Sequence, residues 1–227
     1  MKNTKIPYFQ QIENQISNTL AALYEKRIVY YYLSLKHEPL SKDILRLSWN
    51  NHISGTLNTN DYFLSLEQYK FIIDNNSYLC ILYDGSLIRV SYTFDKDTLI
   101  GQNLLWWPAP YSYKKTTLND VTPQQLIQDF LDDQLWHENI KMRSPIRIDY
   151  DPDDKVVSPN HPAAHLHMQH KDCRINVEKP MCFNRFMKFI LGNYYPFLSF
   201  YFDDRDNIHF NLGTKNYIES TNTKIIC

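Results

Sequence analysis

Apolar side chains recur every three or four residues over the first part of the chain, which is the spacing of one helical face. The pattern begins at Ile12 and Ile16 and continues as far as Leu35, so it predicts a long helix over residues 8–35. Residues 37–59 are mixed and polar, which predicts a connector with a short helix over residues 42–47. Together these stretches predict a helical N-terminal segment, residues 1–60, that packs on the core.

The next part of the chain has the composition of β-strands. Residues 78–83 and 87–94 are rich in aromatic and β-branched side chains, and they flank Asp84-Gly85, a strong hairpin signal. Residues 99–107 can add a third strand, which Pro108 ends because proline cannot donate to a ladder. This part of the chain therefore predicts a three-stranded meander.

Three further stretches carry helical signals. They cover residues 65–74, a segment that begins at Thr122-Pro123, and residues 183–195. Threonine is a good capping residue and proline suits the first helical position, so the second start is well defined. Gly192 and Pro196 end the third helix.

Two segments in the second half alternate polar and apolar residues. Residues 146–151 and 164–168 have this period, and the loop 152–162 between them is rich in Pro, Asp, Asn and Ser. They predict a hairpin with a long loop. The fold class is therefore α+β, with an antiparallel sheet (meander plus long-looped hairpin) flanked by helices, a core domain over 61–212 and a loose tail over 213–227.

Charge and cysteine usage limit the function classes. The 227 residues hold 24 basic and 25 acidic side chains, so no whole-molecule field recruits nucleic acid or an anionic membrane. Any nucleic-acid binding must use a local patch. The four cysteines show no C-x-x-C spacing, and the N-terminus has no apolar leader. We therefore expect a soluble cytoplasmic protein with reduced thiols and no membrane partner.

The predicted long-looped hairpin gathers side chains with chemical potential. Alternation puts Arg147, Asp149 and Asp151 on one face of the first strand, and His165 and His167 on one face of the second. Pairing would bring these faces together. The candidate catalytic residues are Arg147, Asp149, His165, His167 and Arg174, with Tyr150, Asp151 and His161 as supporting candidates.

This cluster allows two kinds of chemistry. In one, Asp149, His165 and His167 bind a divalent metal such as zinc or manganese. In the other, the histidines act as general acid and base in metal-free phosphodiester cleavage, Asp149 orients a ring, and Arg147 or Arg174 stabilises the charged phosphorane. A third interpretation is purely structural, with the histidines hydrogen-bonded in a polar patch. The sequence leaves the need for a metal cofactor open.

Several motifs resemble a bacterial family known as domain of unknown function 2290. They are Tyr83 to Ile88, Ser91 to Phe94, Trp107 to Pro110, Arg147 to Asp151, His161 to His167, and Cys173 to Ile175 with Pro180. The resemblance covers about 65–196, and it implies no activity. The R-x-D segment and the paired histidines are also similar to short bacterial toxins with a comparable H-x-H arrangement. That likeness implies a toxin-like or phage-defence setting with a partner from a neighbouring gene, an antitoxin or an ATPase.

The leading functional hypothesis is a defence-associated or toxin-like nuclease that cleaves RNA, with RNA or DNA as the bound partner. An alternative is a non-catalytic interaction subunit of a multi-protein anti-phage defence complex, which docks through an aromatic surface. A third hypothesis is a metal-dependent hydrolase of a nucleotide or another small molecule, which uses the same cluster as ligands.

Overall fold

The computed structural model describes residues 6–52, 66–111, 121–133, 136–141, 143–153, 155, 157–158, 160–168, 173–198 and 200–212. These ranges contain four α-helices and an antiparallel sheet of nine strands. The helices are α1 (Tyr8–Glu25), α2 (Leu66–Asp74), α3 (Pro123–Asp132) and α4 (Phe183–Tyr194). The strands are β1 (Val29–Tyr32), β2 (Lys36–Pro39), β3 (Ile44–Ser48), β4 (Cys80–Leu82), β5 (Leu87–Asp95), β6 (Thr98–Trp107), β7 (Ile146–Tyr150), β8 (Ala164–Met168) and β9 (Ile175–Asn176). The α+β class predicted from the sequence is confirmed.

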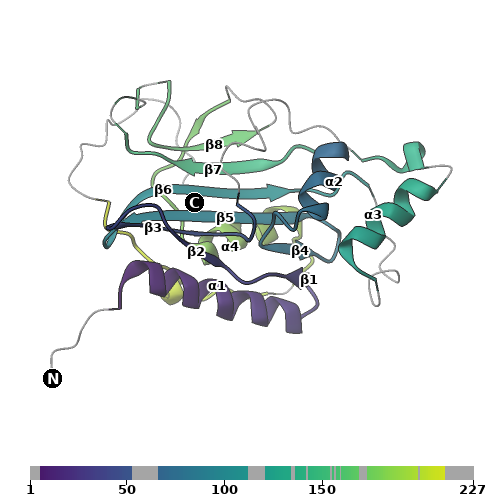
Figure 1. The fold of residues 1–227 in the computed structure, drawn as a ribbon, viewed down its shortest axis with the longest axis horizontal. Helices are drawn as coiled ribbons and strands as arrows, with labels where there is room; N and C mark the ends of the chain where they lie inside the picture. The colour runs from purple at the N-terminus through teal and green to yellow at the C-terminus, as the bar shows by residue number, and fades with distance from the viewer. Residues whose placement is uncertain are drawn as a thin grey trace.

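The sheet runs in the order β1-β4-β5-β6-β7-β8-β9. Strand β5 is long enough to pair with two strands along one edge, β4 near its start and β3 along its second half, and β2 pairs with β3. Gly85 has a positive φ of 83° in the turn between β4 and β5, the conformation for which glycine is favoured. Figure 1 shows the antiparallel strands β5 to β8 side by side across the molecule.

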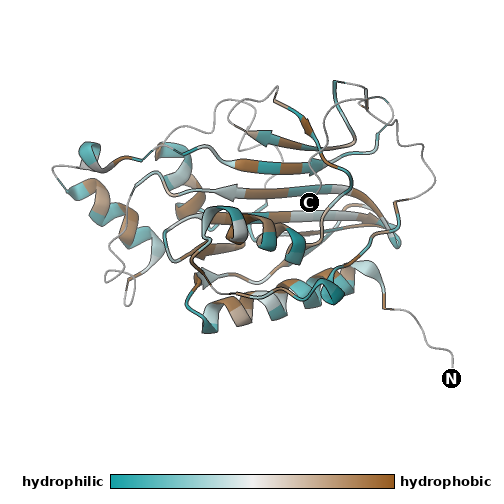
Figure 2. Ribbon diagram, turned by 180° about the vertical axis from the view of Figure 1, so that it is seen from behind, coloured by the Kyte–Doolittle hydropathy of each residue, from teal (hydrophilic) through white to brown (hydrophobic). Residues whose placement is uncertain are grey.

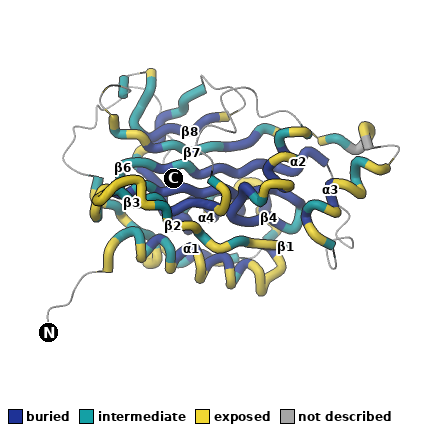
Figure 3. Tube along the Cα trace, in the orientation of Figure 1, coloured by how far each residue is buried: buried dark blue, intermediate teal, exposed yellow. Residues whose placement is uncertain are grey.

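Helices α1 and α4 cover one face of the sheet. Ile16 and Leu20 of α1 pack in one cluster with Phe186 of α4 and with alternate residues of the strands, such as Val90 and Ile148. In the view from behind, α4 lies across the strands, with α1 along the lower edge (Figure 2). The central strands are buried along most of their length, whereas the outer side of α1 is exposed (Figure 3).

Among the described helices, those on the opposite face of the sheet cover it only at one end. Tyr69 and Ile73 of α2 and Ile127 of α3 form a second cluster with Leu87 and Leu105 of this face. Farther along the same strands the positions that face this way are polar, which leaves room for a site. None of the described helices combines the length and the apolar character that crossing a bilayer requires.

Most of the predicted elements are confirmed. They include the helix that becomes α2, the hairpin and third strand that become β4, β5 and β6, the Thr122-capped helix that becomes α3, the β7–β8 hairpin and helix α4. Thr122 Oγ1 accepts a hydrogen bond from the Gln125 N–H at 3.2 Å, as its capping role requires.

The helix predicted over residues 8–35 is longer than the helix observed. Helix α1 ends at Glu25, and residues 29–32 form strand β1 instead. Arg27 takes a left-handed conformation with φ 56°, which ends the helix without glycine. The short helix over 42–47 is also wrong, because Ile44–Ser48 is strand β3 between β2 and β5.

Residues 29–48 of the predicted helical N-terminal segment (1–60) are therefore mostly strands of the central sheet. The predicted boundary at residue 60 and the predicted tail over 213–227 lie outside the described residues.

Candidate active site

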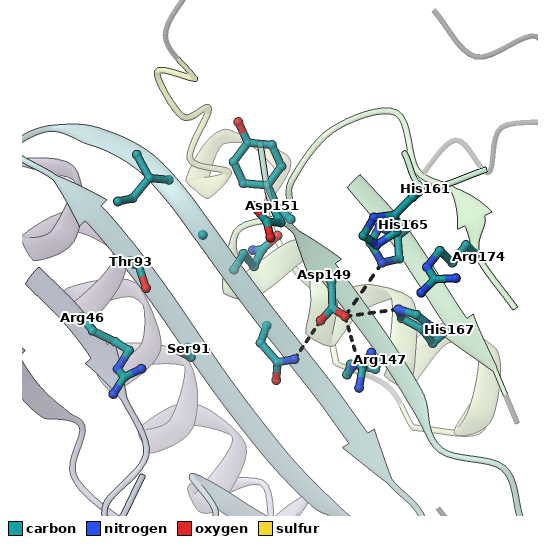
Figure 4. A pocket seen from close by; sticks show the side chains of 15 residues that line it. Arg46, Ser91, Thr93, Arg147, Asp149, Asp151, His161, His165, His167 and Arg174 are labelled. Carbon is teal, nitrogen blue, oxygen red and sulfur yellow. Dashed lines mark hydrogen bonds and ion pairs between the residues drawn. The ribbon is translucent and has the colours of Figure 1, made fainter. Parts of the chain in front are cut away.

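The registers of β6, β7 and β8 align polar side chains on the face of the sheet away from α1 and α4. Asn103 lies opposite Asp149, and Asp149 lies opposite His165. Two residues along, Arg147 lies opposite His167. Directly opposed residues of an antiparallel pair project to the same face. The sheet thus brings four of the predicted catalytic residues together, and Figure 4 shows their side chains around Asp149.

The Asp149 carboxylate is the centre of this cluster. Its Oδ2 lies 2.8 Å from Arg147 Nε, 3.3 Å from His167 Nε2 and 4.0 Å from His165 Nε2. Its Oδ1 accepts a hydrogen bond from Asn103 Nδ2 at 2.7 Å. Both histidine side chains are only 3% exposed. Partners on both oxygens fix the orientation of this carboxylate.

Asp149 is ionised at neutral pH. Burial alone would raise its pKa, but the hydrogen bond from His167 and the charge of Arg147 outweigh that effect and lower the pKa below its usual value. A carboxylate can only accept hydrogen bonds, so the His167 Nε2 that faces it carries a hydrogen. Asp149 thus holds the ring of His167 in one orientation, with the Nε2–H directed at the carboxylate.

His165 carries its hydrogen on Nδ1, whereas His167 has a hydrogen on Nε2. The Nδ1 of His165 lies 2.7 Å from the carbonyl oxygen of Pro162, which can only accept, so Nδ1 carries the hydrogen. Burial lowers the pKa of His165 to about 4, although Asp149 opposes this shift. The ring is therefore neutral at pH 7 with a lone pair on Nε2. Since Nε2 and the Asp149 Oδ2 are both acceptors, a hydroxyl group that enters between them has two atoms to which it can donate.

The remaining predicted residues occupy different positions around this cluster. His161 has its ring centroid 4.8 Å from that of His165, and Arg174 borders the same groove. Asp151 is exposed, and its Oδ1 accepts a hydrogen bond from the Asp153 N–H at 3.0 Å. Tyr150 also borders the groove, but it is buried in the core cluster on the α1 and α4 side.

A single groove of about 780 Å³ contains the cluster and extends well beyond it. Its lining includes His165 and Arg174 at one end and Arg46 and Ser91 at the other (Figure 4). Three arginines, three histidines and two aspartates line the groove, with one serine, one threonine and one asparagine among them. This lining suits a charged or strongly polar ligand.

The geometry disfavours a metal ion at Asp149, His165 and His167, although their ligand atoms lie within 4.8 Å of one another. The Asp149 oxygen that faces the histidines already accepts from the Arg147 cation. Histidine ligands usually donate their second nitrogen to an acceptor. His165 does so through the Pro162 carbonyl, but among the described residues the buried His167 Nδ1 has no acceptor. We therefore assign no step to a metal.

Asn103, Arg46 and Ser91 belong to the groove, but none of them is among the site residues predicted from the sequence. Ser91 and Asn103 lie on strands that the sequence assigns to the meander and not to the long-looped hairpin. Arg46 lies on β3, which the sequence does not predict as a strand. The signal for Asn103 was its polar position within a mostly apolar strand, and it gains meaning only when β6 pairs with β7. For Arg46 no local signal was available, because its strand was predicted as a helix.

The sequence profile of the family described as uncharacterized conserved protein (DUF2290) matches residues 29–226. The match covers most of the chain, so this protein belongs to that family. No curated protein and no solved structure matches the chain.

Proposed function

We propose that this member of the DUF2290 family is a nuclease that cleaves RNA without a metal ion, in a toxin-like or defence-associated setting. The observation that carries the proposal is the pair of buried histidines on one ionised aspartate, with Arg147 beside them, on the floor of a polar groove. Acid, base and cation are the groups that metal-free phosphodiester cleavage requires.

RNA fits this site better than DNA because it supplies its own nucleophile, a 2′-hydroxyl beside each phosphate. His165 Nε2 takes the proton of that hydroxyl, and the oxygen forms a bond to phosphorus as the bond from phosphorus to the 5′-oxygen breaks. His167, oriented by Asp149, gives a proton to the leaving oxygen. The products are a 2′,3′-cyclic phosphate and a 5′-hydroxyl end, and the proton returns from His165 to His167 through solvent.

The two arginines have a separate role in this scheme. Arg147 and Arg174 border the groove on the side of the histidines, where they oppose the negative charge that accumulates on the phosphate oxygens. Because Arg147 also binds Asp149, it links the position of the phosphate to the orientation of the aspartate.

The test compares the wild type with His165→Ala and His167→Ala on a fluorescent RNA and on DNA of the same sequence. We expect each substitution to lower the rate of RNA cleavage by about 10²–10⁴-fold, the usual contribution of a general acid or base. His209→Ala is the matched control, since His209 is exposed and does not line the groove. EDTA should leave the rate unchanged. If both groove variants cleave RNA at the wild-type rate, the assignment of the two histidines is refuted.

An interaction subunit is the second candidate, and exposed aromatic side chains favour it. Phe197 is 73% exposed and Tyr201 is 84% exposed, both beyond the end of α4. Large exposed aromatic residues are common at binding surfaces. The growth of cells that express the wild type or the double variant His165→Ala, His167→Ala separates the two candidates. Growth arrest and RNA loss with the wild type alone support the nuclease, whereas stable co-purification with a neighbouring gene product and no nuclease activity in the complex support the subunit.

A further inference from the structure

The groove continues far beyond the histidine cluster, across the strands to β3. Arg46 on β3 lies opposite Thr93 on β5, and Ser48 lies opposite Ser91. Ser91 lies opposite Asn103 on β6, which lies opposite Asp149 on β7. One row of polar side chains therefore crosses the sheet from Ser48 on β3 to His165 on β8. Arg46 lies two residues along β3 from the end of this row, and Figure 4 shows it at the far end of the groove from His165.

This row is longer than one nucleotide. Neighbouring strands lie about 4.8 Å apart, so the steps from β3 through β5, β6 and β7 to β8 span roughly 19 Å. A nucleic-acid strand with stacked bases advances about 3.4 Å per nucleotide. The groove thus has the length of several nucleotides, and a ligand that reaches from His165 to Arg46 must carry more than one phosphate if it is a nucleic acid.

A buried positive charge lies near the β3 end of the groove, at Arg89 on β5, two residues before Ser91 and on the same face of the sheet. Arg89 is only 6% exposed, and its guanidinium lies 3.9 Å from the centroid of the Trp49 ring. Within the described part of the chain, no carboxylate pairs with Arg89, and its Nε makes no hydrogen bond. A buried cation without an acid nearby costs free energy, which contact with an aromatic face offsets only in part. Its positive charge adds to that of Arg46 and favours an anion at this end of the groove.

Arg46 is the cation at this end that a ligand in the groove can contact. Its Nε and Nη2 both donate to Glu38 Oε2, at 3.0 and 2.6 Å, which holds the side chain in place at the wall of the groove. Serine and threonine hydroxyls at positions 91 and 93 line the floor beside it. Arginine with neighbouring hydroxyl groups is a common phosphate-binding combination.

We propose that Arg46, with Ser91 and Thr93 beside it and the charge of Arg89 farther along β5, forms a second phosphate subsite, so that the groove binds a single RNA strand over several nucleotides. The inference rests on the proposed function for the identity of the ligand. It predicts that affinity grows with oligonucleotide length and that Arg46 carries much of this growth.

The experiment measures binding by fluorescence anisotropy with fluorescein-labelled oligouridylates of two and eight nucleotides, in the full chain carrying His165→Ala to prevent cleavage. Arg46→Gln should weaken binding of the octamer about tenfold and of the dimer less than about twofold. A lost phosphate contact should also reduce the slope of log K against log salt by about 0.7, the value for single strands. Arg46→Lys keeps the charge and should retain most of the salt slope.

Two controls separate phosphate binding from a structural role of the Glu38–Arg46 pair. Glu38→Gln breaks the same ion pair but removes a negative charge, so octamer binding should be unchanged or tighter. Lys188→Gln removes a cation that pairs with Asp204 on an exposed surface away from the groove and should have no effect. Thermal unfolding of each variant verifies that the fold is intact.

Three results would overturn the subsite: an octamer affinity and salt slope that Arg46→Gln leaves unchanged, an equal loss for the dimer and the octamer, or a loss of binding in Glu38→Gln. These results leave the nuclease proposal untouched, because RNA cleavage by the wild type tests it separately. If the wild type cleaves RNA and Arg46→Gln does not change octamer binding, only the subsite is refuted. If octamer binding depends on Arg46 and the wild type cleaves nothing, the subsite remains and the nuclease proposal fails.

Discussion

His165 is a histidine that folding keeps neutral, and this has a cost at low pH. Its pKa falls from 6.5 to about 4 because the ring is buried. Between these values the unfolded chain binds a proton that the native ring does not, so stability falls as the pH is lowered through this window. The shift corresponds to at most about 3 kcal/mol of unfolding free energy, present in full above pH 6.5 and lost by about pH 4.

The measurement is urea unfolding between pH 7 and 5, where carboxylates with ordinary pKa values of about 4 are mostly ionised. His165→Asn keeps a donor in place of Nδ1 but does not titrate, so its stability should depend less on pH than that of the wild type. Some dependence remains, because burial together with Arg46 and Arg89 also lowers the pKa of His52 to about 4. A His165→Asn profile that runs parallel to the wild-type profile would show that His165 does not behave as a buried neutral ring.

At the scale of a secondary-structure element, the end of α1 decides where the sheet begins. The Ile28 N–H donates to the Leu23 carbonyl at 2.9 Å and the Arg27 N–H donates to the Tyr24 carbonyl at 2.9 Å, the two bonds of a Schellman motif. Arg27 occupies the left-handed position with φ 56°, which costs a non-glycine residue roughly 1 kcal/mol.

We therefore expect Arg27→Gly to raise the free energy of unfolding by about 0.5–1 kcal/mol in a denaturant titration. Lys26→Gly, one residue earlier, is the matched control. Lys26 has φ −79°, so glycine gains nothing there and should lower stability by a similar amount. Equal effects of the two substitutions would contradict the importance of the left-handed position.

The same helix end explains which elements the sequence could predict. The sequence predicts a helix over Val29–Tyr32 because Ile28, Tyr31 and Leu35 continue the three- and four-residue spacing. The helix instead ends at an arginine, where the usual signal is glycine. By contrast, the alternation around Asp149 and His165 has one interpretation only, and the register of β7 and β8 confirms the shared face that it predicted. Arg46 could not be found in this way, because its place beside the groove depends on pairing with β5, far along the chain.

At the scale of the whole molecule, the family match and the folding unit begin at different places. The family profile starts at residue 29, after α1. Yet Ile12, Ile16, Leu20 and Leu23 of α1 are fully buried in the same cluster as the sheet and α4. Burial of one such side chain contributes about 1.5–3 kcal/mol, so the four together contribute roughly 6–12 kcal/mol. This equals the entire stability of many domains, about 5–15 kcal/mol.

A chain that begins at Val29 should therefore fail to form the native sheet, even though it contains the whole groove. Circular dichroism and size-exclusion chromatography should show an unfolded or aggregated protein without RNA binding. A synthetic peptide of residues 6–28 added in trans should restore part of the folded signal, because it returns the missing apolar face. If the shortened chain instead unfolds cooperatively and binds the octamer with wild-type affinity, the sheet with α4 is stable by itself, and α1 is not needed to hold the groove in shape.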